Sequence, residues 1–297
     1  MTPSLIHMET PKVATIGFFD GVHLGHNYLL DQLKTEAHAR GMQSMVITFA
    51  NHPRLYFDPN CGLHQLTLTD EKVHLLQSKG IDHVVVKHFD AALSQKTSQE
   101  FMRMLVEEHH VALLLMGHDH RFGSDKESNI EQYISYGAQI GLEVKRCKGY
   151  ISSDVMVSSS KVRKALEFWD IPLANQLLGY PYSIRGVVVP GAQIGRQLGY
   201  PTANLSISSL KHLPSDGVYG VEVDLRGTTY RGVLNIGSRP TVSGASKSVE
   251  VHLLGYQGDL YSEELTVRFH KFLRHEQKFS SLTDLKNQIA RDIEMWK

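Results

Sequence analysis

Hydrophobic and polar residues follow different periods in the two parts of the chain. Before about residue 150, short β-branched and aliphatic runs alternate with amphipathic stretches of helical period. Beyond residue 182, apolar residues recur at every second position over several segments. The first pattern is typical of a parallel sheet covered by helices, and the second is typical of antiparallel strands. The 297 residues are therefore predicted to form two domains, 1–181 and 182–297.

The first domain is predicted to be an α/β fold of the doubly wound, Rossmann-like kind, with a parallel sheet and helices on both faces. Its expected strands are 13–17, 45–49, 84–89, 111–117 and 142–147. Its expected helices are 26–40, 97–110, 129–138, 162–168 and 173–178. Thr97 and Glu100 have the spacing of a capping box. Gly179 and Pro181 then mark the predicted boundary.

The second domain is predicted to be an antiparallel β-barrel, with a sandwich as the alternative. Its expected strands are 184–189, 218–225, 228–236, 249–254 and 265–272. Arg226 and Gly227 lie where a hairpin turn is needed. Leucine and isoleucine recur at helical spacing over 282–293 after the possible cap Ser281, so a C-terminal helix is expected to pack on the barrel.

Charge and composition argue against several classes of protein and partner. Lys plus Arg equals Asp plus Glu at 31 each, which argues against nucleic-acid or anionic-membrane partners. The longest apolar run, 111–116, is far shorter than the ~20 residues that span a bilayer. Residues 1–10 lack a signal-peptide pattern. Two cysteines favour a reducing compartment, although one disulfide is compatible with the sequence. We expect a cytoplasmic protein of unspecified oligomeric state.

A first candidate site lies between the first strand and the first helix, at the edge where open α/β sheets bind ligands. Gly21 and Gly25 let the backbone approach a ligand, and the helix start favours phosphate. His23 and His26 add imidazoles that can stabilise charge at a phosphoryl centre. A chance polar turn or a partial metal site is the alternative. Neither a Walker motif nor a G-x-G-x-x-G fingerprint occurs in the chain.

Two further features bear on this site. The segment 158–163 offers hydroxyls, backbone N–H groups and two cations before a helix, which suits the pyrophosphate of ATP; a simple helix cap is the alternative. Thirteen of the 17 histidines precede Arg121, which raises the possibility of zinc. Neither His118 with His120 nor the pair 109–110 has recognisable third and fourth ligands, so surface or core histidines are favoured.

A second candidate site lies in the β part, in a long loop over 191–204 that can wrap phosphates. Its candidate phosphate-binding residues are three glycines and an arginine: Gly191, Gly195, Arg196 and Gly199. Thr202 and Asn204 offer hard oxygen donors suited to Mg²⁺, whereas a plain Gly/Pro turn is the alternative. Glu250 alternates with Val249 and Val251 on an expected strand, so its carboxylate is expected to face away from theirs. An ordinary exposed carboxylate is the alternative.

On these motifs the chain resembles the bacterial bifunctional riboflavin kinase/FAD synthetases. The matching segments of the first part are H-x-G-H at 23–26, S-S-S-K-V-R at 158–163, G-H-D-H-R-F-G at 117–123 and T-F-x-x-H-P at 48–53. Those of the second part are G-R-x-L-G at 195–199, P-T-A-N at 201–204, and segments 217–219, 235–241, 250–253 and 272–279. Together these matches span nearly the whole chain.

The resemblance implies two reactions. The barrel would phosphorylate riboflavin with MgATP to FMN, and the α/β domain would transfer AMP from a second ATP to FMN, which yields FAD and pyrophosphate. It also implies catalytic roles for His23, His26 and Glu250, the last as the base that accepts the proton of the ribityl 5′-hydroxyl. ATP would be a co-substrate, and Mg²⁺ the cofactor, held by Thr202 and Asn204.

Further binding roles follow from the same resemblance. The adenylyltransferase ATP site would comprise Gly17, Phe18, Asp20, His23, Gly25, His26, Asp119, Ser159, Ser160 and Arg163. Within it, Asp119 would help to place nucleotide or flavin, and Arg163 would bind the leaving phosphates. Arg274 would lie near the flavin or the nucleotide of the kinase, with a solvated cation as the alternative.

The chain departs from the family pattern at two places. His120 stands where an aromatic residue is common, and 124–127 replace a stretch that is often richer in glycine and basic residues. The alternative function is therefore a riboflavin kinase, or a flavin-binding regulatory protein, whose adenylyltransferase half is weak or inactive. A third possibility is nucleotidyl transfer to another phosphorylated substrate.

Overall fold

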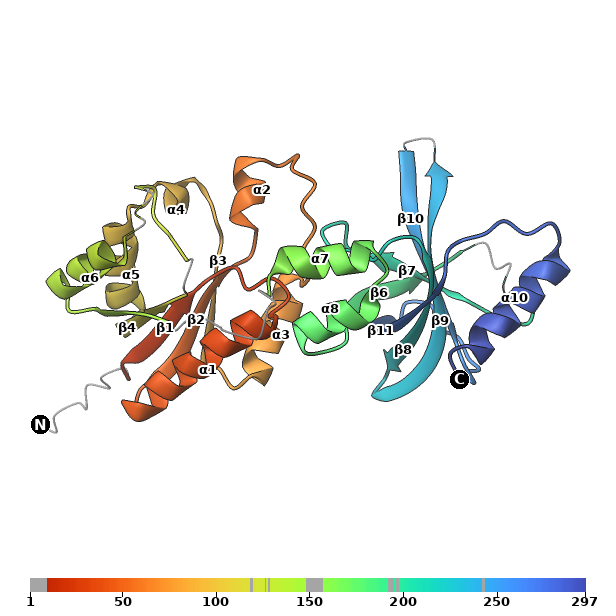
Figure 1. Cartoon of the computed structure of the whole chain (residues 1–297), viewed down its shortest axis with the longest axis horizontal. Coiled ribbons are helices and arrows are strands. Elements are labelled where there is room, and N and C mark those ends of the chain that lie inside the picture. The colour runs from red at the N-terminus through yellow and green to blue at the C-terminus, as the bar shows by residue number, and fades with distance from the viewer. Residues whose placement is uncertain are drawn as a thin grey trace, which may run out of the picture. The chain divides into compact units, whose positions relative to one another are not determined.

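The computed structural model of the protein describes residues 10–117, 120–125, 127, 129–147, 157–191, 195, 198–241 and 244–297. Two compact units are present (Figure 1). The first comprises residues up to 156 apart from 64–66, and the second comprises 64–66 and 157–297. Contacts thus group the segment 157–181 with the second unit, whereas the boundary at 181, which divides the two functions, stays a prediction.

The first unit is built on a five-stranded sheet in which every pair is parallel. Its strands are β1 (Lys12–Ile16), β2 (Gln43–Phe49), β3 (His83–Lys87), β4 (Val111–Met116) and β5 (Glu143–Arg146). Their order is β3-β2-β1-β4-β5, so the direction of winding reverses beside β1. The predicted doubly wound fold is confirmed. Open sheets of this kind bind ligands at the carboxyl ends of the strands beside such a reversal.

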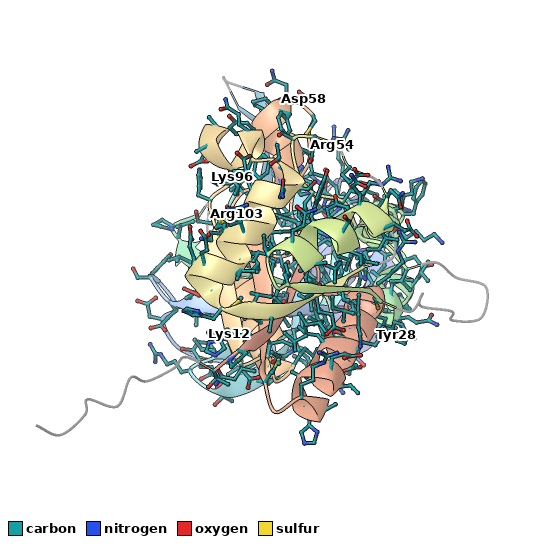
Figure 2. All side chains as sticks on the ribbon, turned by 90° about the vertical axis from the view of Figure 1, so that its left-hand side faces the viewer. Lys12, Tyr28, Arg54, Asp58, Lys96 and Arg103 are labelled. Carbon is teal, nitrogen blue, oxygen red and sulfur yellow. The ribbon has the colours of Figure 1, made fainter. Side chains whose placement is uncertain are left out.

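Helices cover both faces of this sheet. Val13 of β1 packs with buried residues of α1 (Leu24–Ala39) and α3 (Thr69–Ser78), whereas its neighbour Ala14 packs with residues of α5 (Ser98–His109) and α6 (Ile130–Gln139). In Figure 2, Tyr28 on α1 and Arg103 on α5 accordingly lie on different sides of the unit.

The helices of the first unit agree only in part with those predicted from the sequence. The capping box of α5 is confirmed, because the Glu100 carboxylate accepts from the Thr97 amide at 2.8 Å and the Thr97 hydroxyl accepts from the Glu100 amide at 3.2 Å. The sequence patterns did not predict α3 or the short helices α2 (Pro53–Phe57) and α4 (Ala91–Gln95).

The second unit is a closed barrel, so the barrel prediction is confirmed and the sandwich is wrong. Its strands are β6 (Ser183–Val189), β7 (Ala203–Ile207), β8 (Gly217–Leu225), β9 (Thr228–Thr241), β10 (Gly244–Leu253) and β11 (Glu264–Arg274), in the order β10-β7-β6-β11-β8-β9. The segment that contains Asn204 was expected to be loop. It is instead strand β7, which pairs with both β6 and β10 and so closes the barrel.

Helices α7, α8 and α10 pack in the described part of the second unit. Residues of α7 (Ser159–Glu167) and α8 (Ile171–Leu178) belong to the barrel core. The C-terminal helix α10 (Leu282–Glu294) begins where the sequence predicts, since the Ser281 hydroxyl accepts from the Asp284 amide at 3.1 Å. Among the described residues, no helix has the length and apolarity needed to cross a membrane.

Two candidate active sites

The first candidate site begins with a strained turn after β1. Phe19, Gly21 and Val22 all have positive φ, at 55°, 78° and 36°. A β-branched residue such as Val22 rarely adopts this conformation, so surrounding contacts must hold it. Thr67 supplies two of them: its hydroxyl accepts from the Gly21 amide at 3.0 Å, and its amide donates to the Asp20 carboxylate at 3.1 Å. The turn is therefore fixed before any ligand arrives.

Two stacked imidazoles follow the turn at the start of α1. The His23 and His26 ring centroids are 3.6 Å apart and the ring planes differ by 13°. His23 caps the helix, because its Nδ1 accepts from the His26 amide at 3.3 Å. Among the described residues, buried Nδ1 of His26 has no hydrogen-bond partner. An unpaired ring nitrogen at a helix N-terminus is suited to a phosphate ligand.

Both imidazoles are held in the neutral form. Burial lowers the pKa of His23 to about 4, against a smaller opposing effect of its own backbone. The pKa of His26 lies well below its usual value, first because of burial and then because His23, when protonated, and the Lys72 ammonium repel a proton there. At neutral pH these rings therefore act as N–H donors and not as cations.

An exposed aromatic cluster lies on and beside α2, and sequence reasoning missed it. Tyr56 and Phe57 are 38% and 69% exposed, and both rings pack edge-on against Phe89 at 5.5 and 5.8 Å. The helix is connected to the turn through its N-cap residue His52, whose ring lies 4.3 Å from that of Phe18. The available signal was the aromatic pair that follows T-F-x-x-H-P. Flat, exposed rings of this kind suit stacking with a planar ligand.

The other predicted residues of the adenylyl site lie beside the turn or on α7. Gly17 follows β1 and Gly25 lies in the first turn of α1. Ser159, Ser160 and Arg163 begin α7 in the second unit, where the Arg163 Nε donates to the His64 carbonyl at 3.0 Å. Their part in ATP binding stays a prediction.

The segment after Gly117 is described only in part. Asp119 lies outside the described residues. Residues 124–127 depart from the family pattern. Among them, the Asp125 carboxylate accepts from the Ser98 hydroxyl at 2.7 Å and from the Ser98 amide at 3.1 Å. These bonds hold the start of α5, so this departure from the family pattern has a structural role.

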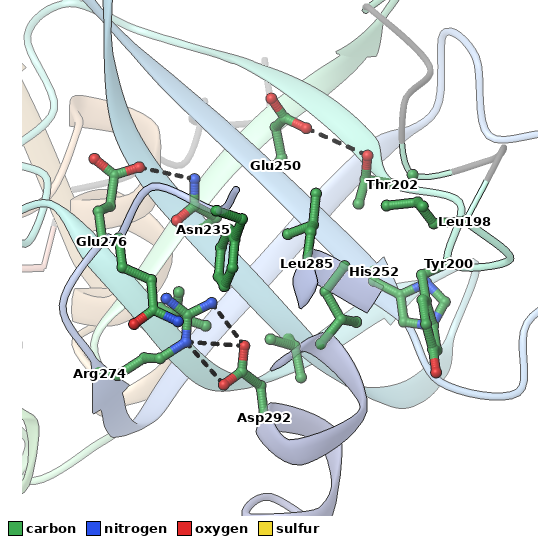
Figure 3. A pocket seen from close by; sticks show the side chains of 16 residues that line it. Leu198, Tyr200, Thr202, Asn235, Glu250, His252, Arg274, Glu276, Leu285 and Asp292 are labelled. Atoms are coloured by element: carbon green, nitrogen blue, oxygen red, sulfur yellow. Dashed lines mark hydrogen bonds and ion pairs between the residues drawn. The ribbon is translucent and has the colours of Figure 1, made fainter. Parts of the chain in front are cut away.

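The second candidate site is a cavity of about 310 Å³ on the barrel (Figure 3). Glu250 of β10 lies in register with Asn204 of β7 and Asn235 of β9. Its neighbours Val249 and Val251 are 3% and 0% exposed, so Glu250 occupies the opposite face, as the alternation predicts. The carboxylate thus lies in a row of polar residues that runs across three strands.

The loop before β7 lies against this row. The Thr202 hydroxyl is 3.3 Å from the Glu250 Oε2 (Figure 3). A side chain at Gly191 would overlap the Asn204 amide, and one at Gly195 would overlap the Tyr200 carbonyl. Both glycines are therefore required for the loop to approach the strand ends. Gly199 has a φ of 84° and also favours glycine, whereas Arg196 lies outside the described residues.

Arg274 is not a solvated cation, so that alternative is wrong. Its guanidinium binds the Asp292 carboxylate of α10 bidentately, with Nε–Oδ1 and Nη2–Oδ2 distances of 2.9 Å (Figure 3). Asp292 is 1% exposed, and Gln288 also donates to it at 2.9 Å. The pair fixes α10 against β11, and Leu285 and Ile289 of the same helix line the cavity. Sequence reasoning missed Asp292, whose only signal is its place on the apolar helix face.

A second cavity of about 370 Å³ adjoins the first at Thr202, which lines both. Its walls include the aliphatic residues Val188 and Leu253 and the aromatic residues Tyr256 and Tyr261. The hydroxyl of Thr202 and the nearby carboxylate of Glu250 are therefore placed where two separate ligands can meet.

Comparisons with known proteins match both halves of the chain. A family profile described as FAD synthetase matches residues 5–161, and one described as Riboflavin kinase matches residues 178–297. A bifunctional riboflavin kinase/FMN adenylyltransferase of Pseudomonas fluorescens is 41% identical over 95% of this chain and 90% of its own length. The relative from Escherichia coli K12 is 40% identical over 94% and 90%. The chain belongs to this family.

A solved structure also resembles this member of the bifunctional riboflavin kinase/FMN adenylyltransferase family over its whole length. A Streptococcus pneumoniae protein described as a macrolide-efflux protein has a TM-score of 0.87 at 27% identity, and the match covers 100% of this chain and 95% of that one. The matches of the two family profiles leave only residues 162–177 between them, within α7 and α8.

Proposed function

We propose that this chain catalyses both reactions for which its family is named, each in one of the two sites described above. It phosphorylates riboflavin with ATP to FMN, and it transfers AMP from a second ATP to FMN to give FAD and pyrophosphate. Matches to both family profiles support this bifunctional enzyme over a kinase with an inactive second half. The row of Asn204, Glu250 and Asn235 beside Thr202 carries the assignment of the kinase site.

Glu250 is proposed as the base of the kinase reaction. Its carboxylate takes the proton of the ribityl 5′-hydroxyl as that oxygen forms a bond to the γ-phosphorus of ATP and ADP departs. The two cavities that meet at Thr202 provide a place for each substrate. The one beneath α10 has room for the flavin, and the one lined by Val188, Leu253 and Tyr256 suits an adenine ring.

The side chains of this site also suit Mg²⁺. The Thr202 hydroxyl and the Asn204 amide oxygen are neutral hard donors, and they adjoin a carboxylate, which matches the preference of Mg²⁺ for few protein oxygens with phosphate completing its shell. Thr202 and Asn204 are proposed to hold it. When bound, the ion would neutralise charge on the phosphates of ATP.

The adenylyl transfer is proposed to occur at the turn and stacked imidazoles of the first unit. An oxygen of the FMN phosphate forms a bond to the α-phosphorus of ATP while the bond to the leaving pyrophosphate breaks. The nucleophile is already anionic, so the site needs donors and not a base. His23, His26 and the start of α1 supply these donors, and the rings of Tyr56 and Phe57 suit the isoalloxazine.

Ser159, Ser160 and Arg163 begin α7 and are proposed to bind phosphate, because hydroxyls at a helix start and a guanidinium are suited to its charge.

One experiment tests the proposed function. Purified protein is incubated with riboflavin, ATP and Mg²⁺, and separately with FMN, ATP and Mg²⁺, and the flavins are separated by chromatography. The proposal expects FMN and FAD in the first reaction and FAD in the second. FMN without FAD would instead support a kinase with an inactive adenylyltransferase half.

A further inference from the structure

Lys72 is a fully buried lysine in the first unit. It lies in the first turns of α3, and its relative exposure is 0%. A buried ammonium is unfavourable unless hydrogen bonds and opposite charge compensate for the lost water. Leucine or methionine would fill this buried position without that desolvation cost. Packing alone therefore does not explain why a lysine is buried here.

The neighbours of Lys72 all belong to the carboxyl edge of the sheet. Its Nζ donates to the carbonyl oxygen of Phe49, at the end of β2, at 2.8 Å. The same nitrogen lies 3.8 Å from the centroid of the Phe18 ring, a cation–π contact to the turn after β1. The buried carboxylate of Asp20, two residues further along the turn, also attracts the ammonium. Lys72 thus contacts the base of the turn that carries the proposed phosphate site.

The positive charge acts on that site through a medium of low dielectric. Lys72 is one of the charges that lower the pKa of His26. Asp20 from the turn and His26 at the start of α1 interact electrostatically with Lys72, and His52 at the start of α2 contacts its aromatic partner Phe18. The Asp20 carboxylate offsets part of the positive charge and the neutral His26 adds no screening, so part of the field of the ammonium reaches the phosphate region.

We propose that Lys72 is a positioning residue of the adenylyl transfer: from beneath the turn, its ammonium fixes Phe18 and the end of β2 and provides a fixed positive charge behind the bound phosphates of ATP. This inference rests on the proposed adenylyltransferase function and assigns to it a residue outside the recognised motifs. Lys72 does not touch the substrate in this proposal, and it acts through Phe18, Phe49 and the electrostatic field.

Replacing Lys72 by methionine removes the charge at nearly constant volume. For Lys72→Met we expect the KM for ATP in adenylyl transfer to rise roughly tenfold and kcat/KM to fall roughly ten- to hundredfold, because a small displacement at a phosphoryl site has effects of this size. The kinase activity of the same molecules should stay within twofold, which shows that the change acts on the first unit only, and circular dichroism checks that this unit is folded. Lys79→Met, at the other end of α3, is the matched control and should leave both activities unchanged.

The pH dependence separates positioning from mere packing. Burial lowers the pKa of Lys72 to about 8, so the wild-type ammonium loses its proton between pH 7 and 9. At constant ionic strength, the wild-type KM for ATP in adenylyl transfer should rise severalfold over this range, whereas that of Lys72→Met should stay flat. Lys72→Arg keeps its charge at pH 9. In folded Lys72→Arg protein, the KM for ATP at pH 9 should therefore equal the wild-type KM at neutral pH.

Three outcomes would overturn the inference. The first is a Lys72→Met protein with lower thermal stability but wild-type kcat/KM, which means a packing role only. The second is a wild-type KM for ATP that does not change between pH 7 and 9, a result that needs no substitution. The third is a Lys79→Met variant as impaired as Lys72→Met. A wild-type protein that makes no FAD at all would instead contradict the proposed adenylyltransferase function itself.

Discussion

The two candidate sites handle charge in opposite ways. At the end of β1, burial keeps His23 and His26 neutral, and the buried cation of Lys72 lies behind the turn. On the barrel, Glu250 lines an open cavity, and Arg274 binds the buried carboxylate of Asp292. One site thus presents neutral N–H donors on a rigid turn, whereas the other presents a carboxylate on a strand.

The chemistry of the two nucleophiles explains this difference. An alcohol such as the ribityl 5′-hydroxyl must lose a proton as it attacks, so the kinase needs an accessible base. The phosphate of FMN is already an anion, so the adenylyltransferase needs donors that offset accumulating negative charge. The proposed function therefore assigns a carboxylate to one reaction, and neutral imidazoles with a buried cation to the other.

Glu250→Gln should have the largest effect. General-base catalysis contributes roughly 10²–10⁴-fold, so FMN formation from riboflavin should fall about a thousandfold. FAD formation from supplied FMN should be unchanged, because that reaction needs no such base. Initial rates of both reactions, measured by chromatography, provide the test. Glu264→Gln, a change to a carboxylate paired with Arg185 on the barrel, is the control. A loss of less than tenfold would show that Glu250 is not the base of the kinase reaction.

His26→Ala should impair the other reaction, the formation of FAD. Loss of one preorganised donor typically costs about 10²–10³-fold in rate, so FAD formation should fall by about a hundredfold while FMN formation is spared. His38→Ala, in the last turn of α1, is the control. The division of labour between the sites would be wrong if both reactions fell together in folded protein.

Arg274→Met should mainly affect stability and the cavity wall. It leaves the Asp292 carboxylate buried without its partner, which typically costs about 3–5 kcal/mol, and the displaced α10 should raise the KM for riboflavin. Both tryptophans, Trp169 and Trp296, belong to the second unit, so thermal unfolding followed by their fluorescence reports this loss.

The matched double variant separates charge from packing. The double variant Arg274→Met with Asp292→Asn should lose less free energy of unfolding than the two single variants lose together, because no unpaired charge is left. Strict additivity would show that the ion pair contributes nothing to the attachment of α10.

Acid should weaken the first unit through its buried imidazoles. The pKa of His23 is lowered from 6.5 to about 4, so between these values the unfolded chain binds more protons than the folded one, and the free energy of unfolding falls as pH falls. This stability is fully present above pH 6.5 and is lost as pH falls through 4. We expect a loss of roughly 2 kcal/mol over this window.

Urea unfolding followed by circular dichroism at pH 6.5 and 4.5 measures this loss. His23→Asn keeps a helix-capping side chain and should reduce the pH dependence, whereas His74→Asn, at an exposed position of α3, should not. Equal pH dependence in wild type and His23→Asn would show that His23 does not titrate in this way.

The local features of the fold were predictable because neighbouring residues determine them. The alternation of Glu250 with Val249 and Val251 gave its face, and the spacing of Thr97 and Glu100 gave the start of α5. The position of the first site also followed from a short motif, since strand, turn and helix are contiguous there.

The features that sequence reasoning missed depend on distant partners. Strand β7 was expected to be loop, because its glycine- and proline-rich approach is typical of turns, and only its pairing with β6 and β10 makes it a strand. The same pairing decides between barrel and sandwich. It brings Asn204 into register with Glu250, although 46 residues separate them in the chain.

Sequence patterns alone predicted two domains, their fold classes, the family and the motifs that mark each site. Which charges are buried depends on contacts between segments that are distant in the chain. Lysine and aspartate are usually exposed, so nothing local distinguishes Lys72 or Asp292 from surface residues. Their burial is possible because the Phe49 carbonyl, the Phe18 ring and the Arg274 guanidinium reach them from other elements. A buried charge is stable only with such partners, and folding alone brings those partners together.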